Sequence, residues 1–251
     1  MKNLARPDKV RPAASPPAFT LAIDVGGTGL KAAVLDAKGK LTGDRVRVDT
    51  PYPCPPKVMV NTLAKLVKPL AAFDRVSIGF PGYIRGDKVV TAPHFGNEIW
   101  HGFNLAKALG TELGKPVRLL NDADLQGLAT IKGIGLELVI TLGTGVGTAL
   151  FRAGELMPHL ELSHHPVNKS KTYNQFLGKK ALDKIGKEKW NQRVERAIEI
   201  LRGLFNYDTL YIGGGNSVNV TCKLAANTKI VSNENGLLGA FMLWNLKRST
   251  R

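Results

Sequence analysis

Short apolar runs alternate along the chain with longer segments whose apolar residues recur every three or four positions. The short runs predict strands at residues 19–23, 32–35, 45–49, 76–80, 117–120, 136–140, 149–151 and 209–212. The longer segments predict helices at residues 105–113, 191–207 and 237–246, and one after the Pro-rich stretch 51–56 with Val60, Leu63, Leu66, Val67 and Leu70 on its buried face. Residues 83–100 are expected to form a loop. Strands that alternate with helices predict an α/β fold with ligands at the carboxyl ends of the strands.

Two glycine-rich segments of the same design each connect two of the predicted strands. They read DVGGTGLK at residues 24–31 and TLGTGVGT at residues 141–148. A tight glycine turn brings backbone N–H groups together in a concavity that favours phosphate, and Thr28 and Thr144 add hydroxyl donors. One such loop alone is also typical of an ordinary hairpin turn. Because the two loops match, we interpret them as an internal repeat of two half-domains with a phosphate-bearing ligand between them.

Neither loop fits the other common phosphate-binding signatures. The dinucleotide fingerprint needs a helix after its last glycine, whereas residues 148–151 are β-prone. The chain also has no Gly-x4-Gly-Lys-Ser/Thr segment, which excludes a P-loop.

The repeat predicts two lobes in this chain of 251 residues. We expect a small N-terminal α/β lobe over residues 19–122, completed by a C-terminal helix at 236–251, and a larger C-terminal α/β lobe over residues 123–235. Residues 1–18 are expected to form a disordered arm, which lacks the apolar centre of a secretory signal. No run approaches the length of a membrane span, and Cys54 and Cys222 are isolated. We therefore expect a cytoplasmic protein without membrane contact, disulfide framework or zinc cluster.

Basic residues exceed acidic ones, which gives a net charge of +15 and a pI near 9.9. This balance indicates an anionic partner. The charge is concentrated in residues 169–193, where only Asp183 and Glu188 oppose eight basic residues: Lys169, Lys171, Lys179, Lys180, Lys184, Lys187, Lys189 and Arg193. Two interpretations stay open here, a solvated basic face and a track for a polyanion, either nucleic acid or polyphosphate.

Six short motifs in a fixed order carry a resemblance that covers the chain from Phe19 to the last predicted helix. They are DVGGTGLK at 24–31, GFPG at 79–82, LNDAD at 120–124, LGTGVG at 142–147, ELSH at 161–164 and IGGGN at 212–216. This order resembles the ROK family of sugar kinases and, within it, the polyphosphate glucokinase branch. The resemblance implies the two-lobed actin-like ATPase (ribonuclease H-like) fold, an active site in the cleft between the lobes, and a homodimer.

The resemblance also implies roles for individual residues. Asp122 would be the general base for the sugar 6-hydroxyl, and Asp24 would hold Mg²⁺ through water. Taken alone, an Asn-Asp pair after a strand is typical of a helix cap, and Asp24 and His164 have ordinary structural explanations too. The other implied residues fall into three groups: Gly26, Gly27, Thr28, Lys31, Gly143, Thr144 and Gly145 for the donor phosphates; Pro81, Gly82, His94, Asn121, Asp122, Glu161 and His164 for the sugar; and Gly213, Gly214, Gly215 and Asn216 for a nucleotide.

The chain departs from the family pattern at three positions near the sugar motifs. Ser163 replaces a glycine, Pro166 stands where this branch often has a second glutamate, and His94 stands where asparagine is common. The identity of the sugar is therefore less determined than the kinase activity. The Cys-x-Cys-Gly segment that supplies zinc ligands in many members is absent from the sequence, so no structural zinc is expected.

The leading hypothesis is a glucokinase that transfers a terminal phosphoryl group from inorganic polyphosphate, with or without ATP as a further donor, to the 6-hydroxyl of glucose. Its polyphosphate track would comprise Lys169, Lys171, Lys179, Lys180 and Lys184. The alternative is a strictly ATP-dependent hexokinase of the same family, acting on glucose or mannose.

Two further classes are weaker. A sugar-responsive DNA-binding regulator needs an N-terminal helix-turn-helix, whereas the residues before the first predicted strand are Pro-rich or polar, so no specific nucleic acid partner is expected. A catalytically silent sugar sensor is the other class, and the intact Asp122 argues against it.

Overall fold

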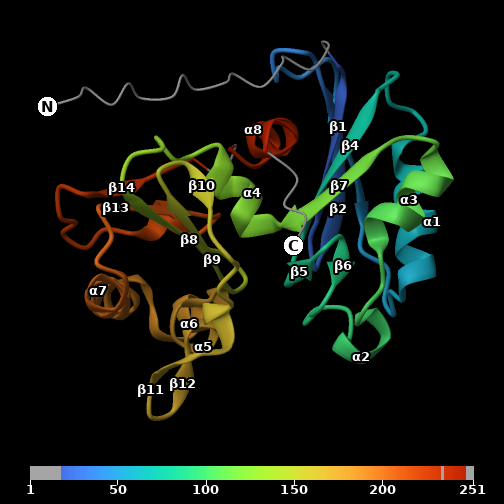
Figure 1. Ribbon diagram of the computed structural model, residues 1–251. Helices are drawn as coiled ribbons and strands as arrows, with labels where there is room; N and C mark the ends of the chain where they lie inside the picture. The colour runs from blue at the N-terminus through green and yellow to red at the C-terminus, as the bar shows by residue number, and fades with distance from the viewer. Residues whose placement is uncertain (1–17, 233–234, 247–251) are drawn as a thin grey trace, which may run out of the picture.

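The computed structural model describes residues 18–232 and 235–246. Two five-stranded sheets form the centres of two lobes, and helices cover the faces of each sheet (Figure 1). The mixed α/β architecture predicted from the strand and helix pattern is confirmed. Residues 1–17 of the expected arm and residues 247–251 of the expected C-terminal helix lie outside the described residues.

The two sheets share one strand arrangement, which confirms the internal repeat. The strand order is β3-β2-β1-β4-β7 in the first sheet and β10-β9-β8-β13-β14 in the second. In each sheet a glycine-rich loop joins an antiparallel pair, and a parallel strand lies on the other side of the first strand of that pair. The bounds are β1 Thr20–Val25, β2 Gly29–Leu35, β3 Val46–Asp49, β4 Arg75–Phe80, β7 Val117–Asn121, β8 Leu136–Leu142, β9 Val146–Arg152, β10 Glu155–Leu156, β13 Thr209–Gly213 and β14 Thr228–Ile230.

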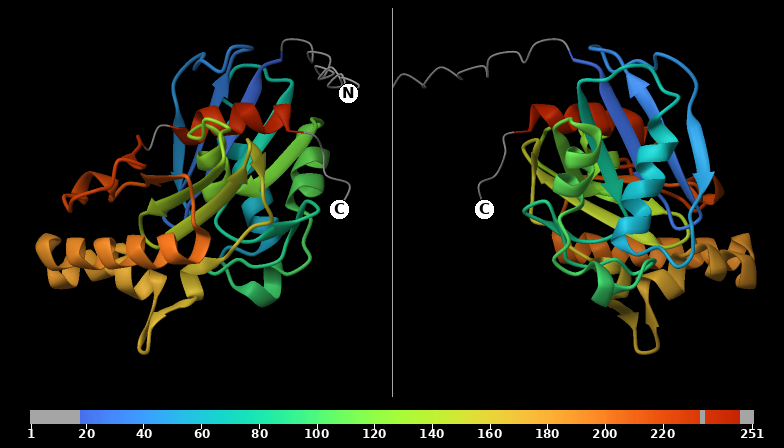
Figure 2. Two further views of the ribbon diagram at one scale, coloured as in Figure 1. Left: turned by 60° about the vertical axis from the view of Figure 1, so that its left-hand side comes forward. Right: turned by 90° about the vertical axis from the view of Figure 1, so that its right-hand side faces the viewer.

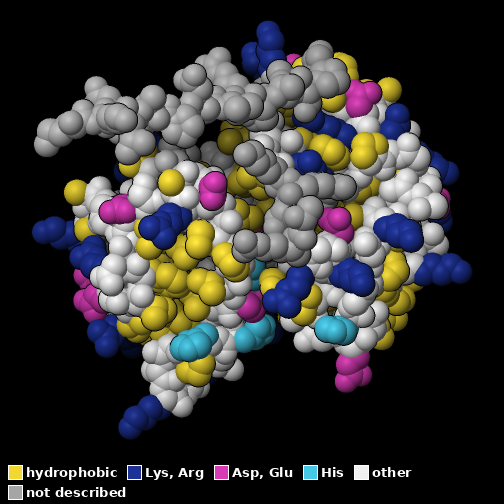
Figure 3. All heavy atoms as spheres, viewed as in Figure 1, with side chains coloured by type: hydrophobic (Ala, Val, Ile, Leu, Met, Phe, Trp, Pro, Cys, Tyr) yellow, Lys and Arg dark blue, Asp and Glu magenta, His cyan; other side chains and the backbone are white. Residues whose placement is uncertain are grey.

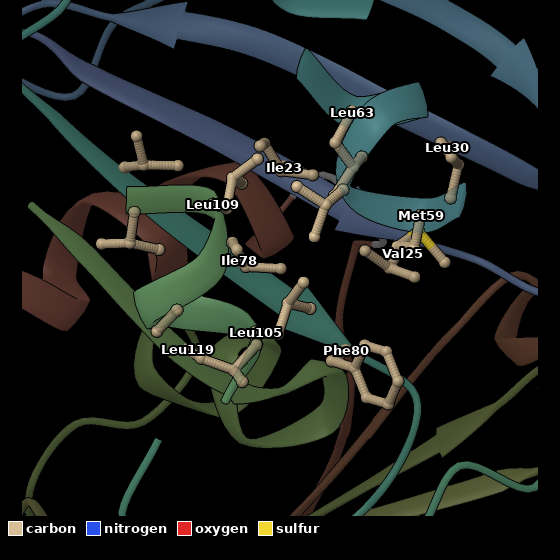
Figure 4. Packing of buried hydrophobic residues seen from close by; sticks show 14 of the residues in the cluster. Ile23, Val25, Leu30, Met59, Leu63, Ile78, Phe80, Leu105, Leu109 and Leu119 are labelled. Carbon is tan, nitrogen blue, oxygen red and sulfur yellow. The ribbon is translucent and has the colours of Figure 1, made fainter. Parts of the chain in front are cut away.

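Two helices, α1 (Pro56–Val67) and α3 (Leu105–Leu113), cover one face of the first sheet. Figure 4 shows their leucines interdigitating with residues of β1, β4 and β7. Proline in the first turn begins α1, and the side chain of Asn104 caps α3 by accepting from the N–H of Lys107. Leu70, expected on the buried face of the first helix, packs on this core from beyond its end.

The second sheet carries its main core on the face covered by α5 (Tyr173–Leu177), α6 (Lys179–Ile185) and α7 (Lys187–Phe205). Trp190 of α7 is fully buried there and donates its indole N–H to the carbonyl of Leu177 at 2.9 Å. The predicted helix at 191–207 is confirmed and begins one turn earlier. The basic stretch, to which no element was assigned before residue 191, contains α5, α6 and the start of α7.

A pair of helices lies between the sheets. Helix α4 (Asp122–Leu128) packs on the second sheet, and α8 (Asn235–Met242) packs on β1 and β4 of the first sheet and on α4 (Figure 2). The crossing is so close that a Cβ added at Gly239 would overlap the carbonyl oxygen of Leu125. The final helix, predicted at 237–246, starts two residues earlier, at Asn235. It is also shorter than predicted, because a 3₁₀ turn, η3 (Leu243–Asn245), replaces its last turn.

The expected loop at 83–100 is partly ordered as regular structure. It contains the short hairpin of β5 (Ile84–Arg85) and β6 (Lys88–Val89) and the one-turn helix α2 (Asn97–Trp100). Elements this short have no periodicity to reveal them in a sequence. The remaining small elements are β11 (Pro166–Asn168), β12 (Lys171–Thr172), η1 (Leu162–His164) and η2 (Ser217–Asn219). Among the described residues, no helix is both long enough and apolar enough to cross a lipid bilayer.

The tight crossing of α4 and α8 makes a testable prediction. Gly239→Ala should lower the free energy of unfolding by about 1–3 kcal/mol, because the new methyl group must push the two helices apart. Gly236→Ala in the same helix is the matched control, since a Cβ there meets open space. The control should be neutral or stabilising by at most about 1 kcal/mol. Urea unfolding measures both, and equal midpoints for the two variants would contradict the packing described here.

Candidate functional site between the lobes

A cleft of about 1080 Å³ lies between the two lobes. It is lined by the carboxyl ends of β1, β4, β7, β8 and β13 and by both glycine-rich loops. In the space-filling view, histidine side chains gather around the lower side of the hollow where the lobes face each other (Figure 3). The location agrees with the rule that α/β sheets bind ligands beyond the carboxyl ends of their strands.

Both glycine-rich loops close with one internal hydrogen bond and leave other N–H groups free. The N–H of Gly26 donates to the carbonyl of Gly29 at 3.0 Å, and the N–H of Gly143 donates to that of Gly145 at 2.9 Å. Within the described chain, the N–H groups of Gly27, Thr144 and Gly145 make no hydrogen bond to protein. These three donors line the cleft, which is the arrangement that binds phosphate oxygens.

Side chains of the second lobe hold the second loop in place. Asn174 accepts from the N–H of Val146 at 2.7 Å, and Asn216 donates its amide to the carbonyl of Gly143 at 3.0 Å. A Cβ at Gly145 would lie 2.6 Å from the Asn174 amide oxygen, so this position requires glycine unless the asparagine moves. Asn174 was missed by sequence reasoning, since a lone asparagine in a basic stretch carries no signal.

The end of β7 delivers Asn121 and Asp122 to the cleft. Asn121 caps α4, accepting from the N–H groups of Ala123 at 2.8 Å and Asp124 at 3.2 Å. Its amide nitrogen donates to the carbonyl of Gly82 at 3.1 Å, which fixes the end of β4 beside the end of β7. The helix-cap interpretation therefore holds for Asn121, and the cap places Asp122 as the first helical residue with its carboxylate facing the cleft.

The carboxylate of Asp122 lies in an unfavourable environment for its charge. Its side chain is exposed to the open cleft, while the surrounding protein partly desolvates it on the other sides. This desolvation, reinforced by the negative charges of Asp24, Asp124 and Glu161, raises the pKa of Asp122 to about 7. Burial likewise raises the pKa of Asp24, although Lys31, with Nζ 3.6 Å from the Asp24 carboxylate, opposes the shift.

Two histidines of the sequence-predicted sugar set face the cleft. The ring of His94 lies against Gly27 of the first loop, where an added Cβ would come within 3.4 Å of it. Burial lowers the pKa of His94, and the neighbouring positive charge of His164 lowers it further. A neutral imidazole at this position can both donate to and accept from a ligand.

Glu161 faces the cleft as expected, but a histidine that the sequence motifs did not single out holds it. His159 lies with its Nδ1 3.1 Å from the Asp124 carboxylate and its Nε2 3.7 Å from the Glu161 carboxylate. Ser163, which departs from the family pattern, donates its hydroxyl to Glu161. No spacing rule connects residue 159 to residue 124, so this cluster could be found only in the folded chain.

The basic stretch divides into residues that face the cleft and residues that do not. Lys171, Lys180 and Lys184 line it, together with Arg193 and, from the first lobe, Arg45. Lys169 lies outside the lining, as does Lys179, which pairs with Asp183 at 2.9 Å.

Most of the other predicted site residues also meet in the cleft. Pro81, Gly82, Lys31, Gly214 and Gly215 line it, whereas Thr28, Gly213 and Asn216 do not. Gly214 has a φ of 85° and packs on the backbone of Leu142, so its position needs glycine. Among the residues that the structure describes, no three His, Cys, Asp or Glu side chains are arranged to hold a metal ion by themselves.

Comparisons with known proteins identify the family of this chain. Residues 20–160 match the ROK family. The polyphosphate glucokinase of Mycobacterium tuberculosis (strain H37Rv) is 32% identical over 77% of this chain and 76% of its own length. The protein of the same description from Mycobacterium leprae is 30% identical over 81% of this chain and 68% of its own.

Solved structures show the same fold. The inorganic polyphosphate/ATP-glucomannokinase of Arthrobacter sp. strain KM superimposes with a TM-score of 0.81 at 31% identity, covering 93% of this chain and 100% of that one. A ROK family glucokinase from Streptomyces griseus, with glucose and AMPPNP, has a TM-score of 0.73 at 19% identity, covering 90% of this chain and 98% of that one, and supports the fold alone. The chain has the two-lobed actin-like ATPase fold of these sugar kinases and belongs to the ROK family.

Proposed function

We propose that this protein is a polyphosphate-dependent glucokinase, which transfers the terminal phosphoryl group of inorganic polyphosphate to the 6-hydroxyl of glucose. One observation carries the proposal: a single cleft contains a carboxylate, Asp122, two loops with free N–H donors, and a lysine-lined wall. Relatives described as polyphosphate glucokinase, at 32% identity over most of the chain, support the choice of donor and acceptor.

Asp122 accepts the proton of the sugar hydroxyl as that oxygen attacks the phosphoryl group. A carboxylate with a pKa near 7 is a stronger base than an ordinary aspartate and is still ionised at slightly alkaline pH. Glu161 and His164 bind other sugar hydroxyls, and Asn121 and Gly82 form the floor of the same subsite. His94 lies between this subsite and the first loop, where it can contact sugar or phosphate.

The two loops bind the donor from opposite lobes. The free N–H groups of Gly27, Thr144 and Gly145 donate to phosphate oxygens, and Lys31 adds a positive charge next to the first loop. The N–H groups of Gly26 and Gly143 are used inside their own turns, so those two glycines shape the loops. Thr28 lies outside the cleft lining and would reach a phosphate only if the lobes closed further.

Magnesium fits the acidic end of this site. Asp24 and Asp122 are two carboxylates that line the same cleft, and Mg²⁺ is held in such sites by one or two carboxylates together with substrate phosphates and water. Asp24 is the ligand we propose, directly or through water. When bound, the ion would neutralise charge on the transferred phosphoryl group.

A basic wall guides the polyphosphate chain. Lys171, Lys180 and Lys184 line the cleft on the side of the second loop, and a repeating anion can contact them in succession. Lys169 and Lys179 complete the proposed track at its outer end. The pairing of Lys179 with Asp183 gives this lysine the weakest role in the track.

ATP is a second candidate donor because Gly214 and Gly215 also line the cleft and present bare backbone to a ligand. Gly213 and Asn216 would then support these two residues from behind. On the family resemblance, we further propose that the enzyme is cytoplasmic and forms a homodimer. Light scattering on the purified protein will test the dimer.

Purified protein should convert glucose to glucose 6-phosphate with Mg²⁺ and polyphosphate freed of nucleotides. The lysine-lined wall lies in the same cleft as Asp122, so polyphosphate needs no adenosine to be held there. The measurement is a coupled assay for glucose 6-phosphate with polyphosphate or ATP as donor, and mannose as a second acceptor. Turnover with ATP alone would favour the strictly ATP-dependent kinase, and turnover with neither donor would favour a silent sugar-binding protein.

Asp122→Asn should lower kcat by roughly 10²–10⁴-fold, the usual contribution of a general base. The fold should be preserved because Asn121, not Asp122, provides the main cap of α4. Thermal stability at pH 8 should be equal or higher, since the substitution removes a charge that burial and Asp24 disfavour. Calorimetry of glucose binding to the variant serves as the control, because binding shows that the sugar subsite is still folded. A variant that retains wild-type turnover would remove Asp122 from the mechanism.

The double variant Lys180→Glu, Lys184→Glu should raise the KM for polyphosphate by roughly tenfold or more and change the KM for ATP much less. The control is Lys187→Glu, Lys223→Glu, which changes the net charge equally at two exposed positions outside the cleft lining. Wild-type KM for polyphosphate should also rise with salt, because exposed charges are screened. Equal effects of the two double variants would show that the basic stretch acts only as a solvated face.

A further inference from the structure

The side chain of His159 is buried between two carboxylates of the second lobe, Asp124 and Glu161, and the ring of Tyr83 from the first lobe. The His159 side chain is 7% exposed, and the Asp124 side chain beside it is 3% exposed. The ring stacks on Tyr83 of the first lobe, with centroids 5.5 Å apart and planes inclined by 17°. The imidazole is therefore held on one face by an aromatic ring and along its edge by two carboxylates.

The arrangement favours the charged form of the imidazole. A neutral ring can donate from only one nitrogen, whereas the imidazolium can donate toward Asp124 from Nδ1 and toward Glu161 from Nε2. Burial by itself would lower the pKa of His159, but the hydrogen bond to Asp124, the ion pair with Glu161 at 3.7 Å and the charges of both carboxylates outweigh it and raise that pKa to about 10. Tyr83, Asp124 and Glu161 are the polar or titratable groups that contact the ring.

Glu161 gains a fixed orientation from the same cluster. One carboxylate oxygen accepts from the Ser163 hydroxyl, and the other faces His159. Burial would raise the pKa of Glu161, but the ion pair with His159, the hydrogen bond from Ser163 and the charges of His159 and His164 lower it. About one third of the side chain remains exposed, toward the cleft.

We propose that His159 is a positioning residue of the sugar subsite: as a buried cation between Asp124 and Glu161, it holds the Glu161 carboxylate ionised and directed into the cleft. Glu161 then accepts a hydrogen bond from a sugar hydroxyl without losing further conformational entropy, because its carboxylate is already oriented. The stack on Tyr83 fixes the ring across the two lobes. The role of Glu161 in binding sugar rests on the proposed function. The charge state of the Asp124–His159–Glu161 cluster is independent of it.

His159→Asn is the sharpest variant, because an asparagine amide can replace Nδ1–H toward Asp124 but carries no charge and does not reach Glu161. The KM for glucose should rise about tenfold or more while kcat changes little, since Glu161 contributes equally to ground-state and transition-state binding. The KM for glucose should also become pH-dependent, rising as pH falls from 8 to 5, because Glu161 without its cation takes up a proton at higher pH. Wild-type KM should rise much less over that range, because Asp122 titrates in both proteins but Glu161 stays ionised only in the wild type.

The matched control is His101→Asn, an exposed histidine outside the cleft whose Nδ1 contacts the carbonyl of Val90. It should leave both KM and its pH profile unchanged. A purely structural His159 would instead lower stability and kcat together, without any pH dependence of KM. That pattern would overturn the positioning role.

A direct measurement covers the case in which the variant does not fold. Long-range ¹H–¹⁵N NMR on the wild-type protein follows the ring nitrogens of its five histidines from pH 5 to pH 10. One ring, assigned to His159 by backbone connectivity, should remain protonated on both nitrogens up to at least pH 9. A His159 that titrates near its ordinary value, about 6.5, would refute the proposal. This readout needs no turnover, so its failure is separate from failure of the proposed function.

Discussion

The side-chain amide of Asn121 joins three parts of the molecule at the point where β7 ends. Its oxygen caps α4, and its nitrogen holds the carbonyl of Gly82 at the end of β4. Capping sets where the helix starts, so it also sets the direction in which Asp122 projects. The same helix packs on the second sheet and against α8, which packs on the first sheet. One buried amide therefore links Asp122, the proposed general base, to the contact between the lobes.

The cleft concentrates negative charge, and the rest of the site is arranged around that constraint. Desolvation raises the pKa of Asp122, and repulsion from Asp24, Asp124 and Glu161 raises it further. Two devices relieve the repulsion: Lys31 beside Asp24, and His159 between the other two carboxylates. The carboxylate left without a cationic partner in the described structure is Asp122, the group that a proton-accepting role requires.

Positive charge is spread over the basic stretch, and only part of it reaches the cleft. Strong net charge attracts anions over a distance, but only side chains that line the cleft hold a ligand there. Lys171 of β12 lines the cleft, and Lys180 and Lys184 do so because α6 begins beside the second glycine-rich loop: the N–H of Lys179 donates to the carbonyl of Gly143. The loop that we propose binds phosphate and the helix that carries Lys180 and Lys184 are thus joined by a backbone hydrogen bond.

Local chemistry explains how much of this could be predicted from sequence. Period and glycine placement predicted the hairpins, α3 with both ends correct, and two matched lobes, because these depend on neighbours within a few residues. Most of the site residues predicted from the motifs also line the cleft. The short elements at 83–100, the Asn174 and Asn216 contacts and the Asp124–His159–Glu161 cluster were not predictable, since each joins residues with no shared periodicity. The sequence determined which chemical groups this protein has and which strands carry them; only the tertiary structure decided which are desolvated together, because burial and charge pairing depend on distance in space.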